Sequence, residues 1–406
     1  MSAWMKVEQA QQHLAAELAA VQGVETLSLE QALGRVAAES ISVPRDVPAQ
    51  ANSAMDGYAL RHADLFERDS LPVSLRVTAG MQPPSLAAGS CARIFTGAVL
   101  PAGADTVVMQ EHTELVDAGV RFLQRPEFGA NVRPAGHDLR QGELLIAAGR
   151  RLGPVELATL AACGLAFITV RRRPRVVLLS TGDELLQVGQ SWRPGALYDS
   201  NSTLIAAVLR QWGCEVICPD IVPDRRDATR AAFDAALAMQ PDLIVSSGGV
   251  SVGEEDHVQA LLQSEGRLAF WKIALRPGKP LCLARWRSCP YLGLPGNPLS
   301  ALVTLTLVCR DAILGLCAQQ PTRLLPLRVS CDLTRRTGER EEILAARQGD
   351  GAWQLASHLS SGALAPTLAS LAWIGLPAHT QIVPGDQVDL WQLKDLLSTA
   401  WSPEAM

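Results

Sequence analysis

The sequence predicts a multidomain protein that combines an α/β domain with two β-rich domains and a helical segment. Strand-like apolar runs alternate with amphipathic helices between residues 173 and 320, which is typical of a sheet covered by helices on both faces, and therefore of three layers. Short β-type runs separated by Pro and Gly fill residues 41–143 and 321–406. The length of 406 residues allows two to four domains of about 100–200 residues each.

The composition excludes two classes of protein. Hydrophobic residues are 48% of the chain and charged residues 19%, so a mainly disordered chain is excluded. The net charge is −5, whereas a general nucleic-acid binder normally has a basic surplus. We therefore expect no nucleic-acid partner.

Membrane insertion and secretion are not expected either. The longest strongly apolar run covers residues 299–309 and ends at Arg310, which is short of the roughly 20 residues that span a bilayer. The first residues are polar and helix-patterned, without the apolar core of a signal peptide. Nine scattered cysteines without a CxxC pair, several of them in apolar runs (Cys163, Cys282, Cys309), indicate free thiols in a reducing cytoplasm.

The N-terminal half begins with helical and then β-type patterns. Residues 7–21 have apolar side chains at helical spacing, and Gly23 is a stop signal. Ser28 is a candidate N-cap for a short helix over residues 29–34. The predicted strands of the next region lie within residues 73–80, 91–99, 105–115 and 120–124. A second helix is predicted over residues 153–163, closed by Gly164.

The RRRPR segment at residues 171–175 marks a domain boundary, and strand–helix alternation follows it. Strands are predicted within residues 175–180, 214–222, 242–249, 269–275, 280–285 and 291–294. Helices are predicted within residues 200–212, 227–239, 257–263 and 300–314. The pattern favours a parallel sheet. From residue 321 onward β-type runs return, within residues 324–331, 341–347, 352–356, 379–383 and 387–393, and predict a small barrel or sandwich.

Three glycine-bearing loops follow strands of the α/β region, where ligands of such sheets bind. Their backbone N–H groups can approach an anion closely, and the helix starting near Pro298 would direct its positive N-terminus to the same edge. The candidate phosphate-binding residues are Gly248, Gly249, Ser251, Pro295, Gly296, Asn297 and Ser300. The same loops carry the carboxylates Asp183, Glu184, Glu254, Glu255 and Asp256. Together they indicate a Mg²⁺-assisted phosphate ester site, although any one of the loops alone is typical of a tight turn.

Other cofactor and catalytic motifs are missing or less specific. No loop reads GxGxxG or GxxxxGK[ST], the seven histidines lack metal-ligand spacing, and no GxSxG occurs. Lysine occurs only four times, and two of these lysines, Lys272 and Lys279, lie in the one segment FWKIALRPGKP. In the β-rich region, the segments around Asp56 and Thr96 are rich in turn residues, so a solvated loop is the alternative to a functional site there.

Six motifs in order resemble one family. NSAMDGYA, FTGAVLPAGADTVV, STGDEL, SSGGVSVGEEDH, FWKIALRPGKP and LPGNPLSA are similar to the motifs of MoeA-type molybdopterin molybdenumtransferases, a family that includes the gephyrin C-terminal domain. The resemblance covers residues 5–395. It implies an elongated homodimer whose active site lies in a cleft between the α/β part of one subunit and the β-rich part of the other.

The resemblance also implies four domains. The implied bounds are 1–26, 44–53 and 141–172 for a discontinuous helical linker domain, 27–43 and 54–140 for an inserted β-rich domain, 173–320 for a molybdopterin-binding α/β domain, and 321–406 for a C-terminal β-barrel.

The implied reaction takes adenylated molybdopterin and molybdate, releases AMP and leaves molybdenum on the pterin dithiolene. The implied catalytic residues are Asp56, Thr96, Glu184, Asp256, Lys272, Arg276 and Lys279. Glu184 and Asp256 would hold Mg²⁺, the three cations would hold phosphate or molybdate, and Asp56 would order a water. Asp138, Asp224 and Arg340 match further family positions. The implied partners are the enzyme that adenylates molybdopterin and the enzymes that receive the cofactor.

Four positions depart from the family pattern. His137 stands where Glu precedes the aspartate of Asp138, and Arg276 stands where Lys is common. The strand around Glu342 reads GEREEIL and lacks the second Arg of a GRREF-like motif, and Ile374 stands where Asn is frequent. The last two departures raise the question whether the C-terminal domain contributes to anion binding.

Three alternatives stay open. One is a molybdopterin adenylyltransferase, which the α/β part alone would suit, although the β-rich insertion and the terminal domain are not needed for it. Another is a gephyrin-like dimeric scaffold that binds partner peptides, against which the acidic residues Asp56, Glu184 and Asp256 argue. The third is a paralogue that inserts tungsten, since tungstate and molybdate are nearly the same size.

Overall fold

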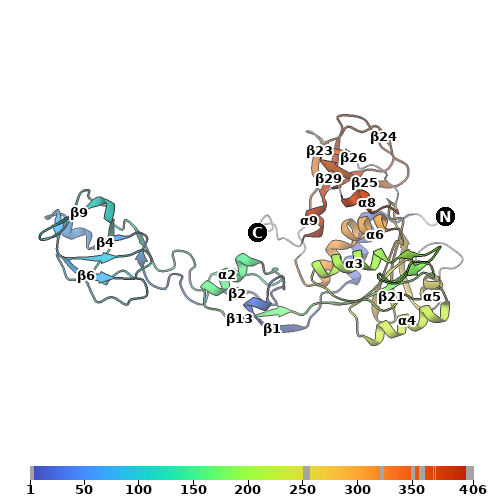
Figure 1. The fold of residues 1–406 in the computed structure, drawn as a ribbon, viewed down its shortest axis with the longest axis horizontal. Helices are drawn as coiled ribbons and strands as arrows, with labels where there is room; N and C mark the ends of the chain where they lie inside the picture. The colour runs from blue at the N-terminus through green and yellow to red at the C-terminus, as the bar shows by residue number, and fades with distance from the viewer. Residues whose placement is uncertain are drawn as a thin grey trace. The chain divides into compact units, whose positions relative to one another are not determined.

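The structure is a computed structural model, and it describes residues 4–249, 257–320, 324–348, 353–355, 362–368, 370 and 372–398. The chain forms two compact units, both drawn in Figure 1. Unit 1 comprises Met1–Glu39, Gly149–Gly153 and Ile168–Met406, and unit 2 comprises Ser40–Ala148 and Pro154–Phe167. Unit 2 is therefore an insertion in the sequence of unit 1. The finer division into four domains stays a prediction.

A six-stranded sheet in the order β17-β14-β18-β22-β21-β19 forms the centre of unit 1. The strands are β14 (Arg175–Ser180), β17 (Glu215–Ile217), β18 (Leu243–Ser247), β19 (Arg267–Lys272), β21 (Pro280–Trp286) and β22 (Cys289–Leu294). β17, β14, β18 and β22 are parallel, as predicted. The prediction of a wholly parallel sheet is wrong, because β21 is antiparallel to both β22 and β19. Trp286 pairs with Cys289, so β21 and β22 form a tight hairpin, which is too short for a parallel crossover.

Helices cover both faces of this sheet (Figure 1). The helices are α3 (Ser200–Gln211), α4 (Arg226–Ala238), α5 (His257–Glu265) and α6 (Pro298–Thr304). Val176 and Leu178 of β14 belong to the core that contains α3 and α6 side chains, whereas Val177 and Leu179 belong to the core formed with α4 and α5. Alternate residues of one strand thus face opposite helical layers, which is the predicted three-layer arrangement.

One long helix runs through the core of unit 1. It consists of α6, a π-helical turn (Leu305–Cys309) and α7 (Arg310–Leu316). The apolar run in the sequence ends at Arg310, but the helix continues to Leu316. The Arg310 side chain is 3% exposed, and this burial is possible because its Nε donates to the Leu396 carbonyl at 3.1 Å. Within the described part of the chain, Pro298–Leu316 is the one helical stretch with the length and composition to cross a membrane, and 83% of its most apolar window is buried inside the protein. A helix that is apolar on all sides is expected at such a buried position.

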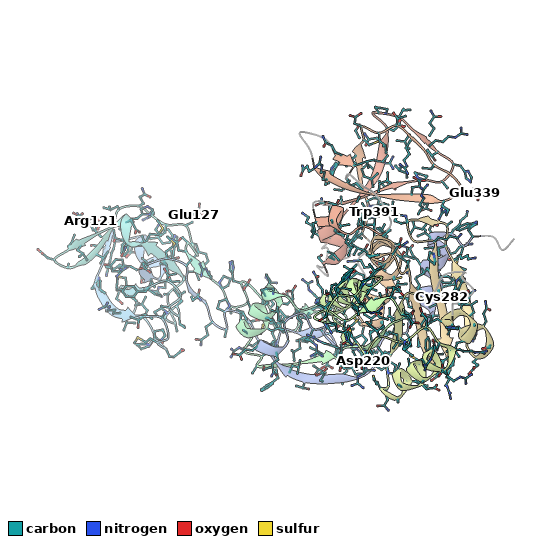
Figure 2. The ribbon with its side chains drawn as sticks, turned by 45° about the vertical axis from the view of Figure 1, so that its right-hand side comes forward. Arg121, Glu127, Asp220, Cys282, Glu339 and Trp391 are labelled. Atoms are coloured by element: carbon teal, nitrogen blue, oxygen red, sulfur yellow. The ribbon has the colours of Figure 1, made fainter. Side chains whose placement is uncertain are left out.

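The C-terminal region forms a second sheet in the order β20-β25-β27-β29-β23, with β26 paired to β25. The strands are β20 (Leu275–Arg276), β23 (Leu327–Ser330), β25 (Glu341–Gln348), β26 (Trp353–Leu355), β27 (Ala372–Leu376) and β29 (Gln387–Gln392), and a separate pair joins β24 (Arg335–Arg336) to β28 (Gln381–Ile382). Ile343 and Trp373 pack into the core of the long helix, and Trp391, labelled in Figure 2, packs against the same core. The predicted β-type texture is confirmed, and this sheet is joined to the α/β core through shared apolar contacts.

Three N-terminal elements differ from the sequence-based expectation or refine it. α1 spans Val7–Glu17, so the predicted helix over residues 7–21 is too long. Leu18 and Val21 are nevertheless buried in the core of unit 1, and their burial explains the apolar spacing. β1 (Val24–Ser28) then pairs with β13 (Phe167–Arg171). The short helix is a 3-10 turn over Leu29–Gln31, and Ser28 makes no side-chain capping hydrogen bond.

Unit 2 is rich in short strands, as predicted. Its main sheet has the order β6-β7-β4-β8, and smaller sheets are β5-β10-β9, β11-β3 and β12-β2. The strands are β2 (Ile41–Ser42), β3 (Asn52–Ser53), β4 (Gly57–Leu60), β5 (Ser70–Leu71), β6 (Val73–Val77), β7 (Cys91–Ile94), β8 (Thr106–Met109), β9 (Thr113–Val116), β10 (Gly119–Phe122), β11 (Val132–Arg133) and β12 (Leu144–Ile146). The predicted second helix is α2 (Pro154–Ala162), and Gly164 follows it with φ +78°.

Candidate active site

Five of the predicted site residues line one cavity of about 370 Å³ in unit 1: Arg276, Lys279, Asn297, Ser300 and Arg340. Arg335 and Glu342 add to its charged lining. Four cationic side chains and one carboxylate leave a net charge of +3, so the cavity favours an anion. The cavity lies where the start of the long helix meets the loop before β21 and strand β25.

Gly278 positions the two cations of this loop. Its φ is +122°, and a Cβ at this position would lie 2.5 Å from Thr304 Oγ1 of the long helix. Only glycine therefore lets the loop rest on the helix. This close approach brings Arg276 and Lys279, on either side of Gly278, to the cavity wall.

Two other side chains, those of Glu342 and Trp4, contact the cations of the cavity. Glu342 is 4% exposed and accepts hydrogen bonds from Arg276 Nη1 at 3.1 Å and from Arg335 Nε at 2.6 Å. The Trp4 ring lies 4.8 Å from Lys279 Nζ and 5.2 Å from Arg340 Cζ, measured to its centroid. Glu342, in the strand that lacks the second Arg of the family motif, is thus a counter-ion to two arginines.

The departure at Ile374 does not reach this cavity. Ile374 is 1% exposed and packs with Leu344 and Leu390 inside the C-terminal sheet region. An apolar side chain suits that position. His137, another position that departs from the family pattern, is exposed in unit 2.

The glycine loops meet at the carboxyl ends of β18 and β22. Gly248 donates its N–H to the Leu294 carbonyl, and a Cβ on Gly296 would lie 3.6 Å from Gly248 Cα. The Asn201 side chain joins the two loops, because its Nδ2 donates to Ser247 Oγ at 2.8 Å and to the Gly296 carbonyl at 2.7 Å. Gly249 has φ +65°, and a Cβ there would lie 2.6 Å from Val258 Cγ2. The predicted convergence of Gly248, Gly249, Pro295 and Gly296 is present.

Three acidic residues lie near the carboxyl end of β14: Asp183, Glu184 and Asp224. Asp224 accepts the Asp183 N–H at 3.3 Å, and Asp183 accepts the Asp224 N–H at 3.1 Å, so the two loops brace each other. Glu184 is exposed, and its Oε2 would be 2.7 Å from a Cβ on Gly182, whose φ is +148°. Asp224 and Glu184 are thus brought to the same loop region.

The acidic residues near β14 suit a Mg²⁺ ion that takes some of its ligands from the substrate phosphates. In the described part of the chain, no three His, Cys, Asp or Glu side chains are arranged to hold a metal ion. Mg²⁺ is commonly bound by one or two carboxylates together with substrate phosphates and waters. The exposed carboxylate of Glu184, near the glycine loops, suits that mode.

In unit 2, two of the candidate catalytic residues, Asp56 and Thr96, are in direct contact. Thr96 donates both its N–H and its Oγ1–H to Asp56 Oδ1, each at 2.7 Å. These bonds, with the charge of Arg93 contributing less, hold the pKa of Asp56 below its ordinary value. Gly57 makes this turn possible, since a Cβ there would lie 1.9 Å from the Val108 carbonyl oxygen of β8.

Other predicted residues lie elsewhere. Lys272 is on β19 opposite Pro280 and is not in the cavity lining. Asp138 is exposed, and its N–H binds the Val47 carbonyl. Ser251 and Asp256 lie outside the described residues.

Sequence reasoning missed several polar residues of these sites. Asp199 is 8% exposed and caps α3 by accepting the Ser202 N–H at 2.9 Å. An Asp followed by an apolar-periodic run is an N-cap signal that could have identified it. Asn201, Arg335 and Glu342 carry no comparable local signal, since their partners are distant in sequence.

Comparison with known proteins gives consistent matches. The family model "MoeA N-terminal region (domain I and II)" matches residues 5–164, and "Probable molybdopterin binding domain" matches residues 177–315. A molybdopterin molybdenumtransferase of Haemophilus influenzae is 39% identical over 324 residues, covering 79% of this chain and 80% of that protein. One from Nostoc sp. is 42% identical over 302 residues, covering 72% and 69%. The crystal structure of a molybdopterin biosynthesis moea protein from Pyrococcus horikosii has a TM-score of 0.83 at 28% identity, covering 96% of this chain and 99% of that one. The chain belongs to the MoeA family of molybdopterin molybdenumtransferases.

Proposed function

We propose that this molybdenum-transferring enzyme takes adenylated molybdopterin and molybdate. A water oxygen adds to phosphorus as the phosphoanhydride bond breaks and AMP leaves. The two dithiolene sulfurs bind molybdenum, and their thiol protons go to one molybdate oxygen, which leaves as water. The observation that carries the proposal is the cavity lined by Arg276, Lys279, Arg335 and Arg340. Its net charge of +3 suits a tetrahedral oxyanion such as molybdate, which is a dianion. Tungstate would fit the same cavity.

The glycine loops are proposed to hold the pyrophosphate of the substrate. The Gly248 and Gly249 backbone can approach phosphate oxygens because neither residue has a Cβ. Asn297 and Ser300 connect this region to the cationic cavity, which they line. Mg²⁺, held by Glu184 and by Asp256, which lies outside the described residues, would offset the negative charge of the phosphates.

Asp56 is proposed to orient a water molecule. Thr96 occupies Asp56 Oδ1 with two hydrogen bonds, which fixes the carboxylate plane and keeps it ionised. Oδ2 can then accept a hydrogen bond from water. A carboxylate with a lowered pKa is a weak base, so its role is orientation and electrostatic stabilisation rather than proton storage.

The family resemblance further suggests a cytoplasmic homodimer with a shared site and a closed C-terminal barrel. Candidate site residues occur in both units, as a site built from two subunits requires. The parallel bridge between Cys331 and Trp353 links the end of β23 to β26 and supports closure of the barrel. The four-domain division belongs to the same proposal.

Release of AMP from adenylated molybdopterin tests the function directly. We expect AMP release to require molybdate and Mg²⁺, and Asp56→Ala to lower its rate by about 10²–10³-fold, the range lost when a preorganised electrostatic group is removed. Asp117→Ala, at an exposed turn of the same unit, is the matched control and should be as active as the wild type. A folded wild-type protein that releases no AMP would refute the transferase proposal.

Mixing two inactive variants tests the shared site. A dimer with Asp56→Ala in one subunit and Lys279→Ala in the other would contain one doubly mutated and one intact site if each site uses both subunits. We therefore expect activity to return when the two inactive dimers are mixed and exchange subunits to form mixed dimers. If each subunit held its own complete site, the mixture would stay inactive.

A further inference from the structure

The four cations of the cavity form two pairs, and each pair shares one partner that is not itself a cation. Arg276 and Arg335 both donate to Glu342. Lys279 and Arg340 both lie against the ring of Trp4. We propose that Glu342 and Trp4 are positioning residues, which hold the four cations in the arrangement that receives an oxyanion. The inference rests on the proposed function of the cavity.

Glu342 is unsuited to contact an anion itself. Its carboxylate would repel molybdate or phosphate, yet it is 4% exposed within the lining of a cationic cavity. A buried carboxylate persists only when it is paired, and here two guanidinium groups pair with it. In the parallel β20–β25 pair, Arg276 is opposite Glu342, so the backbone register sets this contact. Glu342 therefore offsets the mutual repulsion of Arg276 and Arg335 and fixes the direction of each guanidinium.

Trp4 has the same relation to the other two cations. An aromatic face attracts a cation within about 6 Å of its centroid, and Lys279 Nζ and Arg340 Cζ are both inside that limit. The segment that carries Trp4 is anchored, because the Met5 N–H binds the Lys272 carbonyl at 3.3 Å and the Ala274 N–H binds the Met5 carbonyl at 2.8 Å. Trp4 is not in the cavity lining, so it acts on a bound anion through Lys279 and Arg340.

Binding of sodium molybdate to the full chain, measured by titration calorimetry without pterin or Mg²⁺, tests the role of Glu342. Glu342→Asp keeps the charge but withdraws the carboxylate by one methylene, and we expect its dissociation constant to rise about tenfold. Glu342→Gln would tighten binding if charge alone mattered, because the net charge of the lining would rise from +3 to +4. Positioning requires the opposite result, which is weaker binding.

The neighbouring carboxylate supplies a matched control. Glu341 is on the same strand with its side chain on the other face, and it is not in the cavity lining. Glu341→Gln should leave the molybdate affinity unchanged. Unchanged affinity in Glu342→Asp together with tighter binding in Glu342→Gln would overturn the proposal. If Glu342→Gln does not fold, Glu342→Asp decides alone.

The Trp4 role predicts a graded series. Trp4→Phe keeps a weaker aromatic face and Trp4→Leu keeps none, so the dissociation constant should rise in the order Trp, Phe, Leu, by about two- to fivefold in total. Equal affinity in all three proteins would overturn this part of the proposal. AMP release is measured on the same proteins. If the wild type releases no AMP but the dissociation constant for molybdate rises in the expected order, the transferase proposal fails and the positioning role of Trp4 survives.

Discussion

Asp242 joins segments of unit 1 that meet at the amino ends of two parallel strands. Arg172 donates to its two carboxylate oxygens from Nη1 and Nη2, both at 2.7 Å, and the Arg175 N–H donates at 2.7 Å. Burial raises the pKa of Asp242, but the hydrogen bonds from Arg172 and Arg175 outweigh it, so the pKa lies below its ordinary value. The RRRPR segment, which marks a domain boundary in the sequence, is thus also tied to the entry of β18.

The lowered pKa gives the Asp242 contact a defined pH dependence. A carboxyl group whose pKa is lower in the folded state stabilises that state above its unfolded pKa of about 3.9, and the effect is lost as the pH falls through the folded value. We expect Asp242→Asn to lower the free energy of unfolding of unit 1 by about 1 kcal/mol at pH 7, a modest value because the Arg172 side chain is 41% exposed. Urea unfolding followed by tryptophan emission at pH 7 and pH 3 checks this.

The comparison variant is Asp332→Asn, at an exposed position of the same unit, where the change should stay below about 0.5 kcal/mol. A difference between Asp242→Asn and the wild type that persisted unchanged at pH 3 would contradict the assigned cause.

At the residue scale, sequence reasoning identified groups whose signal is local. Asp56 and Thr96 occur in short motifs that resemble those of the family, and the two side chains are in contact. Glu342 reads as an exposed acidic residue, because nothing near it in sequence shows that Arg276, 66 positions away, is its partner. Burial of a charge depends on strand pairing, and strand pairing at such separation has no local signature.

Among the glycines whose surroundings the structure describes, Gly57 at the start of β4 in unit 2 leaves the least room for a side chain. Gly57 pairs with both Ile94 of β7 and Met109 of β8, and a Cβ there would meet the Val108 carbonyl oxygen at 1.9 Å. Since Asp56 immediately precedes Gly57, the same contact positions the candidate catalytic carboxylate. The DG pair reads as an ordinary turn signal in the sequence, so its steric role was not predictable.

Replacing Gly57 tests this contact. We expect Gly57→Ala to lower the free energy of unfolding of unit 2 by about 3 kcal/mol, because the strands must separate to admit the methyl group. Gly129→Ala is the comparison: Gly129 has φ +77° but open space around it, so only backbone strain of about 1–2 kcal/mol is expected. Hydrogen exchange of residues 57–60 and 106–109 measures both effects. Similar exchange in the two variants would contradict the close contact as the reason for the glycine, because Gly57 itself does not have a positive φ.

Periodicity predicted most elements of the α/β core correctly, since strands and helices there alternate in long apolar runs. It failed at two points. The apolar pattern of α1 continues beyond the helix, which ends at Glu17, because Leu18 and Val21 are buried. Periodicity also gave no strand direction, and β21 is antiparallel because a hairpin joins it to β22. Burial sets the pattern in each case, whereas the direction of the chain depends on its turns.

Across the whole molecule, the tryptophans are confined to one unit. All nine, from Trp4 to Trp401, belong to the residues of unit 1, and unit 2 contains none. Tryptophan emission therefore reports unit 1, whereas far-UV circular dichroism reports both units. If the units unfold separately, the two signals need not coincide.

We expect Gly57→Ala to move the circular dichroism transition to lower urea concentration while the tryptophan emission curve stays in place. Asp242→Asn should shift the emission curve instead. Shifts of equal size in both signals for Gly57→Ala would show that the two units unfold as one cooperative body.

The packing of α1 on the long helix has a consequence for synthesis on the ribosome. Gln11 Nε2 donates to the Leu307 carbonyl across 296 positions, so almost 300 further residues must be synthesised before α1 can pack on the long helix. At about 5–20 residues per second, this interval lasts roughly 15–60 s. All residues of unit 2 have been made by Phe167. The half-made chain is therefore expected to carry a folded unit 2 while the apolar face of Ala10 and Leu14 has no partner, which is the kind of surface that a ribosome-bound chaperone shields.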